Sequence, residues 1–263
     1  MTTSSPVIIA VIPARMASSR YPGKPLAAIA GLPMVEHVRR RALLAEGIDH
    51  VVVATCDAAI QEAVEAEGGT AVMTKDTHQR CTDRVQEAML GLPGEIVAIV
   101  QGDEPLLIPA AVRQVTRPLV EDPTLDCVNL LSPLESHADH TNPDIVKAVC
   151  DQSGNIMFLT RAPVPHFRER LDVPVYRQTG IIAFRVSFLH QYTAIPETPL
   201  EKAESVDMLR VLEHGRRILG VVVDYVTLGV DRPHDVAVVE QVLRDDPVQR
   251  DLLERTMQAG YTS

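Results

Sequence analysis

The feature that most constrains the fold is an aliphatic strand followed at once by a basic loop near the N-terminus. Residues 7–12 (VIIAVI) are an unbroken apolar run, mostly β-branched, and Pro13 ends it. A strand of this composition is typically buried on both faces, as in a parallel sheet. The run therefore predicts an α/β fold with a mostly parallel twisted sheet and helices on both faces.

The loop after this strand carries three cations among small residues. Arg15, Arg20 and Lys24 alternate with serines and a glycine. At the carboxyl end of a parallel strand, such a loop presents positive charge and backbone N–H groups, which suits a polyphosphate. The alternative is a solvated basic loop. The loop has neither a G-x-x-x-x-G-K-[ST] nor a G-x-G-x-x-G motif, which disfavours P-loop NTPases and Rossmann oxidoreductases and leaves the nucleotidyltransferases.

Strand and helix patterns then alternate along the chain. Strands are predicted at 50–55, 70–74 and 95–100, and helices at 58–67, 83–92 and 107–120. This alternation indicates right-handed βαβ crossovers in one parallel sheet. The length suits a single domain over residues 1–263.

A stretch at about 132–178 changes character. It is richer in proline, histidine and polar residues, and a D-Q-S-G turn separates two short strand patterns at 145–150 and 156–160. Such a pattern is typical of a hairpin. We interpret this stretch as a small antiparallel insert that contacts a second copy of the chain.

Three helix predictions complete the outline. The arginines Arg39, Arg40 and Arg41 lie mainly off the apolar stripe of a helix that begins near residue 34, which predicts a solvated face. Residues 199–214 read as one amphipathic helix, and 235–244 as the last helix.

Two polar segments are candidates for a site. Residues 75–85 (KDTHQRCTDRV) are dense in hydrogen-bonding groups, which suits a loop over a base or sugar, although Thr82 also fits a helix N-cap. The strand at 95–100 runs directly into Gln101, Gly102, Asp103 and Glu104. Carboxylates at that position mark the crevice of an open α/β sheet, and Asp is a natural ligand for Mg²⁺.

Composition excludes several classes of protein. The formal net charge of −10 over 263 residues argues against a nucleic-acid or membrane-surface partner. The four cysteines are widely spaced without a C-x-x-C motif, so neither a zinc site nor a redox pair is expected. No signal peptide and no apolar run of membrane-spanning length is apparent, and we predict a reduced, cytoplasmic protein.

Several blocks together resemble the 3-deoxy-manno-octulosonate (Kdo) cytidylyltransferases, also called CMP-Kdo synthetases. They are PARMASSRYPGKPL at 13–26, MTKDTHQRCTDRV at 73–85, IVAIVQGDEPLL at 96–107 and GVDRPHD at 229–235. The resemblance implies a Rossmann-like nucleotidyltransferase fold, a homodimer, and CTP and Mg²⁺ as substrate and cofactor. It also implies that an acidic sugar attacks the α-phosphorus of CTP and releases pyrophosphate.

The resemblance also assigns roles to individual residues. The expected catalytic residues are Arg15, Lys24, Asp103 and Asp231, of which Asp103 and Asp231 are the expected metal ligands. The expected nucleotide-binding residues are Pro13, Ala14, Arg15, Arg20, Lys24, Thr74, His78, Thr82 and Arg84. The expected acceptor-binding residues are Arg80, Gln101, Gln178 and Asp207.

The acceptor side departs from the family pattern. Arg80 and Cys81 stand where H-x-S-G-T-[DE]-R has serine and glycine, Gln178 replaces a histidine, and Asp207 replaces a glutamate. The triphosphate and metal residues are kept, so the nucleotide chemistry is expected to transfer better than the acceptor does.

Two acceptors and two other classes of protein are therefore weighed. A Kdo-like 2-keto sugar acid is the family default. The rival acceptor is a phosphonate such as phosphonoformate, to which Arg80 would supply an extra cation. A catalytically inactive nucleotide-binding regulator is disfavoured, because it would need fewer carboxylates. A sugar-1-phosphate nucleotidylyltransferase is also disfavoured, because the G-G-x-G-T-R loop is missing.

Overall fold

The computed structural model describes residues 5–18, 20–169 and 173–259, and its strands follow the predicted order closely. The strands are β1 (Ile8–Ala14), β2 (Ala28–Ile29), β3 (Leu32–Pro33), β4 (His50–Thr55), β5 (Thr70–Met73), β6 (Ile96–Val100), β7 (Cys127–Pro133), β8 (Lys147–Cys150), β9 (Ile156–Thr160), β10 (Tyr176–Arg185) and β11 (Leu219–Val222). The order of the main sheet is β11-β7-β10-β6-β1-β4-β5, and β8 and β9 extend it beyond β10.

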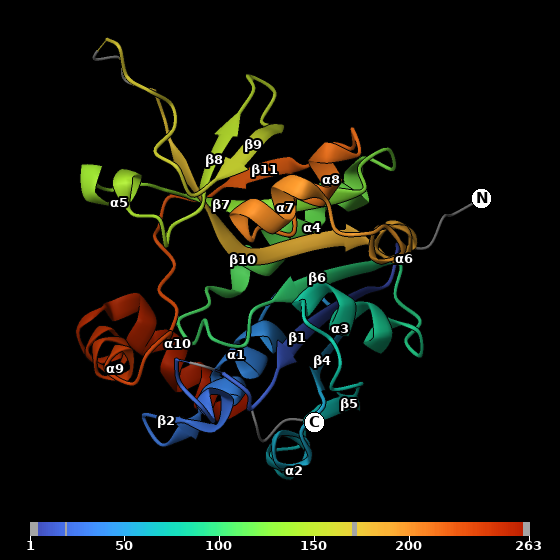
Figure 1. The fold of residues 1–263 in the computed structure, drawn as a ribbon. Helices are drawn as coiled ribbons and strands as arrows, with labels where there is room; N and C mark the ends of the chain where they lie inside the picture. Colours follow the sequence, from blue (N-terminus) through green and yellow to red (C-terminus); the bar gives the residue numbers. More distant parts are fainter. Residues whose placement is uncertain (1–4, 19, 170–172, 260–263) are drawn as a thin grey trace.

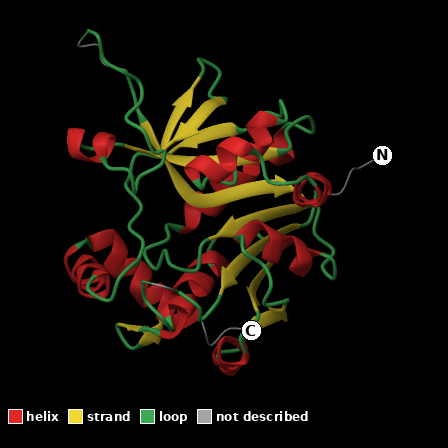
Figure 2. Cartoon of the chain, viewed as in Figure 1, coloured by secondary structure: helices red, strands yellow, loops and turns green. Residues whose placement is uncertain are grey.

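The helices lie on both faces of this sheet (Figures 1 and 2). They are α1 (Met34–Leu43), α2 (Ala58–Ala66), α3 (Cys81–Met89), α4 (Pro109–Glu121), α5 (His137–Thr141), α6 (Val186–Ala194), α7 (Pro199–Glu204), α8 (Leu209–Glu213), α9 (Asp235–Asp245), α10 (Pro247–Gln258) and the 3₁₀ turn η1 (Lys24–Leu26). The helix α10 follows α9, so the prediction that residues 235–244 form the last helix is wrong. None of the described helices has the length and apolarity needed to cross a membrane.

Strand β1 is buried on both faces, as its composition predicts. Ile8, Ala10 and Ile12 belong to the core cluster that includes α1 and α4. Ile9 and Val11 belong to the opposite cluster, which includes α3 and α6. Because β1 pairs in parallel with both β4 and β6, the carboxyl ends of these strands meet at one edge of the sheet.

Strand β10 divides the sheet into two halves. It runs antiparallel to β6 on one side and to β7 on the other. In Figure 1 the strands β6, β1, β4 and β5 form the lower half with α9 and α10 beside them, and β7 to β11 form the upper half. The predicted mostly parallel α/β fold is confirmed, and the antiparallel β10 joins its two halves.

The region at about 132–178 contains the predicted hairpin. Strands β8 and β9 pair antiparallel across the turn at 151–154. The hairpin is not separate from the main sheet, because Lys147 and Ala148 of β8 pair with Arg177 and Tyr176 of β10. Residues 161–169, which follow β9, project from the upper half of the molecule (Figure 1).

The prediction that Arg39, Arg40 and Arg41 form a solvated face is wrong. Their exposed fractions are 4%, 3% and 0%. Glu36 is fully buried one helical turn earlier and accepts hydrogen bonds from Arg39 and Arg40. Arg41 donates to the Gln249 side chain at 2.7 Å, which ties α1 to α10. The pattern of a single helix could not show this, because the covering helix lies over 200 residues downstream in the sequence.

The single helix predicted over 199–214 is also wrong, because two short helices replace it. Ser205 adopts a left-handed conformation with φ 54° and ends α7. Leu200 lies on the apolar stripe that one amphipathic helix over 199–214 would bury, yet it is 41% exposed. Glu201 and Arg210 form a buried bidentate ion pair with contacts of 2.7 and 2.6 Å, which holds α7 against α8.

Candidate active site

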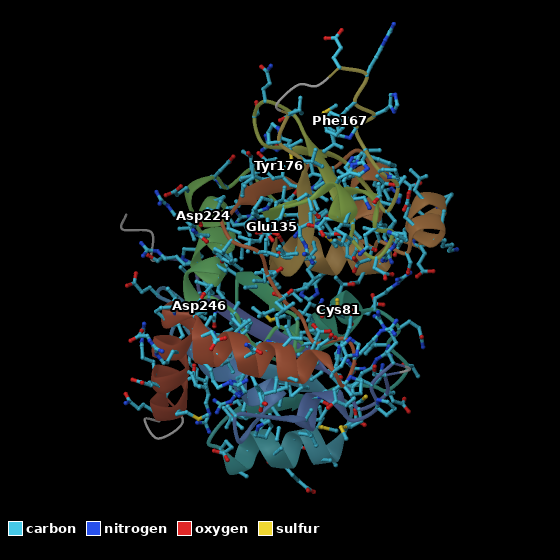
Figure 3. The ribbon with its side chains drawn as sticks, turned by 90° about the vertical axis from the view of Figure 1, so that its left-hand side faces the viewer. Cys81, Glu135, Phe167, Tyr176, Asp224 and Asp246 are labelled. Carbon is cyan, nitrogen blue, oxygen red and sulfur yellow. The ribbon has the colours of Figure 1, made fainter. Side chains whose placement is uncertain are left out.

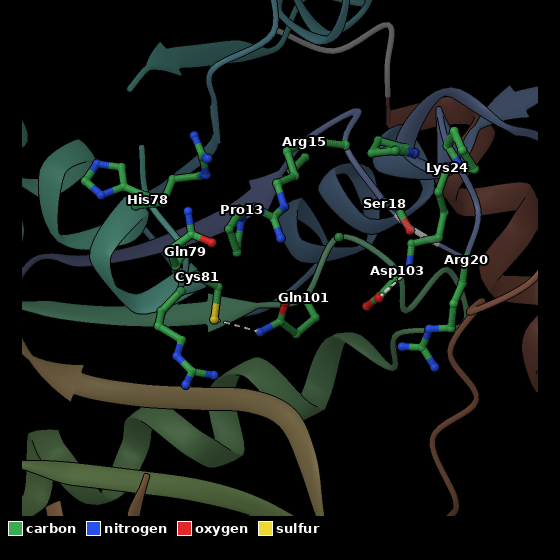
Figure 4. Close-up of a pocket in the computed structure, with 17 residues that line it drawn as sticks. Pro13, Arg15, Ser18, Arg20, Lys24, His78, Gln79, Cys81, Gln101 and Asp103 are labelled. Atoms are coloured by element: carbon green, nitrogen blue, oxygen red, sulfur yellow. Dashed lines mark hydrogen bonds and ion pairs between the residues drawn. The ribbon is translucent and has the colours of Figure 1, made fainter. Parts of the chain in front are cut away.

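A cavity of about 800 Å³ opens where the carboxyl ends of β1 and β6 meet (Figure 4). Its walls come from the loop after β1, from residues 78–81 and Arg84, and from residues 101–103. The structure brings ten of the predicted site residues to this cavity: Pro13, Ala14, Arg15, Arg20, Lys24, His78, Arg80, Arg84, Gln101 and Asp103. This edge is where ligands bind in open α/β sheets.

The loop after β1 is fixed in shape by its own backbone. Gly23 has φ 75°, which a residue with a side chain adopts at a cost, and its N–H donates to the carbonyl of Met16 at 3.0 Å. The N–H of Met16 donates to Asp57 at 2.8 Å, beyond the end of β4. Ser19, which the sequence places within the loop, lies outside the described residues.

Arg15 differs from the other two cations of this loop. Its side chain is exposed, lines the cavity, and makes no hydrogen bond or ion pair with any residue that the structure describes. An uncommitted guanidinium can form a bidentate contact with a phosphate without first breaking an internal ion pair.

Lys24 lies between the two predicted metal carboxylates. Its ammonium is 2.7 Å from Asp103 and 3.9 Å from Asp231, and it donates to the carbonyl of Val230 at 2.9 Å. Arg20 pairs with Asp231 at 3.1 Å. The N–H of Val230 donates to the carbonyl of Asp103 at 2.8 Å. Residues more than 200 positions apart thus form one cluster of alternating charges at the cavity edge.

The donor set of this cluster fits Mg²⁺. Within the described chain no group of three or more His, Cys, Asp or Glu side chains is placed to hold a metal ion. Mg²⁺ does not need such a cage, since it commonly uses one or two carboxylates and completes its shell with water and substrate phosphate. Asp103 and Asp231 supply that number.

Two predicted nucleotide residues, Thr74 and Thr82, do not line the cavity, and Arg84, which does line it, is held by hydrogen bonds within the wall. Arg84 is buried and donates to the hydroxyl of Thr74 and to the carbonyl of Lys75. Thr82 is fully buried, and its hydroxyl lies 3.4 Å from Asp207. Thr74 and Thr82 are therefore behind the surface to which a nucleotide would bind.

The alternative role of Thr82 as a helix N-cap is wrong. The N-cap of α3 is Arg80, and none of the described side chains caps that end. His78, which precedes α3, lines the cavity and hydrogen-bonds to Glu87 of α3. This bond lowers the pKa of the Glu87 carboxyl. This hydrogen bond fixes the imidazole at the cavity wall.

The four predicted acceptor residues are divided between the cavity and its surroundings. Arg80 and Gln101 line the cavity, whereas Gln178 and Asp207 do not. Gln178 donates to Asn129 at 2.8 Å inside the upper half. Burial raises the pKa of Asp207, whose carboxylate accepts from Thr82.

Cys81 was not among the predicted site residues, although its thiol lines the cavity. The amide of Gln101 donates to Sγ of Cys81 at 3.1 Å (Figure 4). Burial raises the pKa of this thiol to about 12, so it stays protonated. The replacement of a family glycine by cysteine was the signal that could have placed it in the site.

Gln101 is confined from a second side. A Cβ added to Gly180 of β10 would overlap the Gln101 side chain, so glycine is required there. The N–H of Gly180 donates to the buried carboxyl of Glu104 at 3.1 Å, and burial and the neighbouring Asp103 raise the pKa of Glu104 to about 7. The segment 101–104 is thus packed directly against β10.

Comparison with known proteins agrees with this geometry. Residues 9–218 match the family model described as cytidylyltransferase. The chain is 41% identical over 246 residues to the 3-deoxy-manno-octulosonate cytidylyltransferase of Syntrophotalea carbinolica, covering 90% of this chain and 98% of that protein. It is 39% identical to the enzyme of the same name from Pelobacter propionicus, covering 90% and 97%.

Solved structures give the same result. A CMP:2-keto-3-deoxy-manno-octonic acid synthetase complexed with CTP superposes with a TM-score of 0.87 at 36% identity, covering 90% of this chain and 98% of that one. A 4-diphosphocytidyl-2C-methyl-D-erythritol synthase from Anaerococcus prevotii superposes with a TM-score of 0.63 at 15% identity, which shows a shared fold.

Proposed function

The chain belongs to the cytidylyltransferase family, and from that premise we propose that it transfers CMP from CTP to a small acidic acceptor and releases pyrophosphate. The observation that carries this proposal is the cluster of Lys24, Asp103, Asp231 and Arg20 beside the uncommitted Arg15. The proposed acceptor is a Kdo-like 2-keto sugar acid, because the relatives that cover nearly the whole chain are named for that substrate.

The proposed reaction depends on charge neutralisation and positioning. Arg15, Arg20 and Lys24 offset the negative charge that moves onto the departing pyrophosphate. Asp103 and Asp231 would hold Mg²⁺, which supplies Lewis-acid polarisation of the phosphate oxygens. The acceptor oxygen is a poor nucleophile, so holding it in line with the α-phosphorus supplies much of the remaining rate enhancement.

The mechanism requires no nucleophile from the protein. Cys81 is the thiol in the cavity wall, and with a pKa raised to about 12 it is uncharged at neutral pH. Direct attack by the acceptor on CTP is therefore the simplest route. It predicts inversion at the α-phosphorus.

We also propose a cytoplasmic homodimer in which the hairpin β8–β9 and residues 161–169 contact the second copy. Met157 and Phe167 of this region are 63% and 44% exposed, and such apolar side chains suit a protein interface. Light scattering of the purified protein measures the oligomeric state directly, and a monomer would contradict this part of the proposal.

A phosphonate is retained as the second candidate acceptor, because Arg80 lines the cavity. Its Nε is 3.3 Å from Glu197 and 4.0 Å from Glu201, and these carboxylates offset part of its charge. That offset favours the sugar acid over a more highly charged anion.

A parallel assay with Kdo and with phosphonoformate decides between the two acceptors. It measures pyrophosphate release with CTP and Mg²⁺, and mass analysis of the CMP conjugate follows. Pyrophosphate release with neither acceptor would count against both.

The first prediction concerns the phosphate loop. Arg15→Ala and Lys24→Ala are each expected to weaken CTP binding and to lower turnover by about tenfold or more, since each removes a charge-assisted phosphate contact. Calorimetry with CTP and steady-state kinetics measure the two effects. Arg113→Ala is the control, because Arg113 is an exposed cation of α4 that pairs with Glu46. Arg40 cannot serve as that control, since it is buried.

The second prediction concerns Arg80. If its guanidinium contacts the acceptor, Arg80→Ser is expected to raise KM for the acceptor by about ten- to a hundredfold and KM for CTP much less. Glu197→Gln is the matched control, because it removes a partner of Arg80 and leaves the guanidinium in place. An unchanged acceptor KM in Arg80→Ser would remove Arg80 from the acceptor site and leave the phosphonate without support.

A further inference from the structure

A second cavity of about 570 Å³ lies between the two halves of the molecule. Its walls come from residues 104–108 after β6, Ile181 of β10, residues 224–228 after β11, and the helices α9 and α10. Figure 3 shows its two sides, with Asp224 on the upper half and Asp246 on the lower half. It shares no lining residue with the candidate active site within the described chain.

Two buried polar atoms at this cavity have no hydrogen-bond partner among the described residues. One is Oε2 of Glu104, a side chain that is only 8% exposed, and the other is the hydroxyl of Tyr225. The other carboxyl oxygen of Glu104 accepts from the N–H of Gly180. Buried polar atoms are normally paired, so this arrangement points to a partner that brings its own hydrogen-bond donor.

The charge around the cavity selects the kind of partner. Glu104, Asp224 and Asp246 contribute three carboxyl groups, and no Lys, Arg or His is among the described residues that line it. Most of the other walls are aliphatic, including Ile108 and Val242. An anion would have to lose its hydration here beside three carboxyl groups. Arg177, whose charge acts on Glu104, is not among the lining residues, so the cavity disfavours CTP and acidic acceptors.

We propose that this second cavity binds a small organic cation, an amine with an apolar body whose ammonium donates to Glu104. The volume is within the range of small-molecule sites, and the combination of apolar walls with a few polar groups is typical of them. An ammonium carries the donors that Oε2 of Glu104 lacks, and the aliphatic walls cover a hydrocarbon of several carbons.

The cavity adjoins both backbone segments that carry the predicted metal carboxylates. Glu104 directly follows Asp103, and residues 224–228 lead into Val230, whose N–H donates to the carbonyl of Asp103. An occupant would therefore contact the segments leading to Asp103 and Asp231. Its binding does not depend on the proposed reaction, so the site is tested by binding alone.

Methyl NMR with three probes of equal chain length tests the site. Hexylammonium, hexanol and hexanoate are titrated to about 10 mM, where a millimolar Kd is measurable, into protein labelled at the isoleucine δ1 methyls. We expect hexylammonium to shift Ile108 and Ile181 saturably, leaving Ile60 on α2 unchanged. Hexanol is expected to bind about tenfold more weakly, and hexanoate not to bind, because only the ammonium pairs with a carboxylate.

Two variants test separately the charge of Glu104 and the volume of the second cavity. Glu104→Gln keeps the side-chain size and should abolish the preference for hexylammonium over hexanol, whereas Asp251→Asn, outside the cavity, should keep it. Val242→Phe reduces the cavity and should weaken both probes. Shifts confined to other methyls, equal binding of amine and alcohol in the wild type, or an undiminished preference in Glu104→Gln would each overturn the proposal. Should Glu104→Gln fail to fold, the wild-type probe series and Val242→Phe still decide it.

Discussion

Asp103→Asn and Asp231→Asn are each expected to lower turnover by at least ~10²-fold, because each removes a charge that would hold Mg²⁺ against the triphosphate. The two carboxylates lie within 4 Å of the same Lys24 ammonium, although they belong to distant parts of the chain. Steady-state kinetics at several Mg²⁺ concentrations measures the effect. The loss is expected to shrink as Mg²⁺ rises, since weaker metal affinity is partly offset by concentration.

The Mg²⁺ dependence separates this role from a simpler one. If Asp103 served only to position Lys24, the loss in Asp103→Asn would be the same at every Mg²⁺ concentration. Asp251→Asn is the matched control, because Asp251 is an exposed carboxylate on α10 that pairs with Arg255. Near-normal turnover of either site variant at limiting Mg²⁺, or a loss that does not change with Mg²⁺ concentration, would remove that residue from the metal site.

Glu36→Ala is expected to lower the free energy of unfolding by about 3–5 kcal/mol, the usual loss when a buried ion pair is broken on one side. Glu36 is fully buried and accepts three hydrogen bonds of 2.7 to 3.0 Å from Arg39 and Arg40. Its removal leaves two buried guanidinium groups with one counter-charge fewer. Urea denaturation followed by circular dichroism measures the change.

An exposed ion pair provides the comparison for this stability experiment. Glu46 pairs with Arg113, and both side chains are more than half exposed. Glu46→Ala should therefore change the free energy of unfolding by at most about 1 kcal/mol. Similar small losses in Glu36→Ala and Glu46→Ala would show that the buried cluster of α1 contributes little to stability.

The local sequence is sufficient to predict the two strands that lead into the site. The unbroken aliphatic run of β1 predicts a strand buried on both faces, and the 95–100 run predicts β6. Residues that follow directly after such strands reach the same sheet edge whatever the rest of the chain does. For that reason the amino-acid sequence alone is enough to predict that Arg15, Lys24 and Asp103 lie at one edge of the sheet.

The features that the sequence predicted wrongly depend on contacts that no local sequence pattern shows. Arg39, Arg40 and Arg41 read as a solvated face because charged side chains are usually exposed. Their burial is stabilised by contacts with Glu36, Glu67, the carbonyl of Leu107 and α10. The break between α7 and α8 depends likewise on Ser205 in a left-handed conformation and on the Glu201–Arg210 pair.

Local runs of residues are sufficient to specify the α/β fold class, the edge of the sheet that carries the site, and the charged residues of the phosphate loop. Packing between distant segments is what places Lys24 between Asp103 and Asp231 and turns Gln178 away from the cavity. The same packing forms the second, acidic cavity beside Glu104. Lys24 and Asp231 are more than 200 positions apart in the sequence, and no local pattern encodes a contact over that separation.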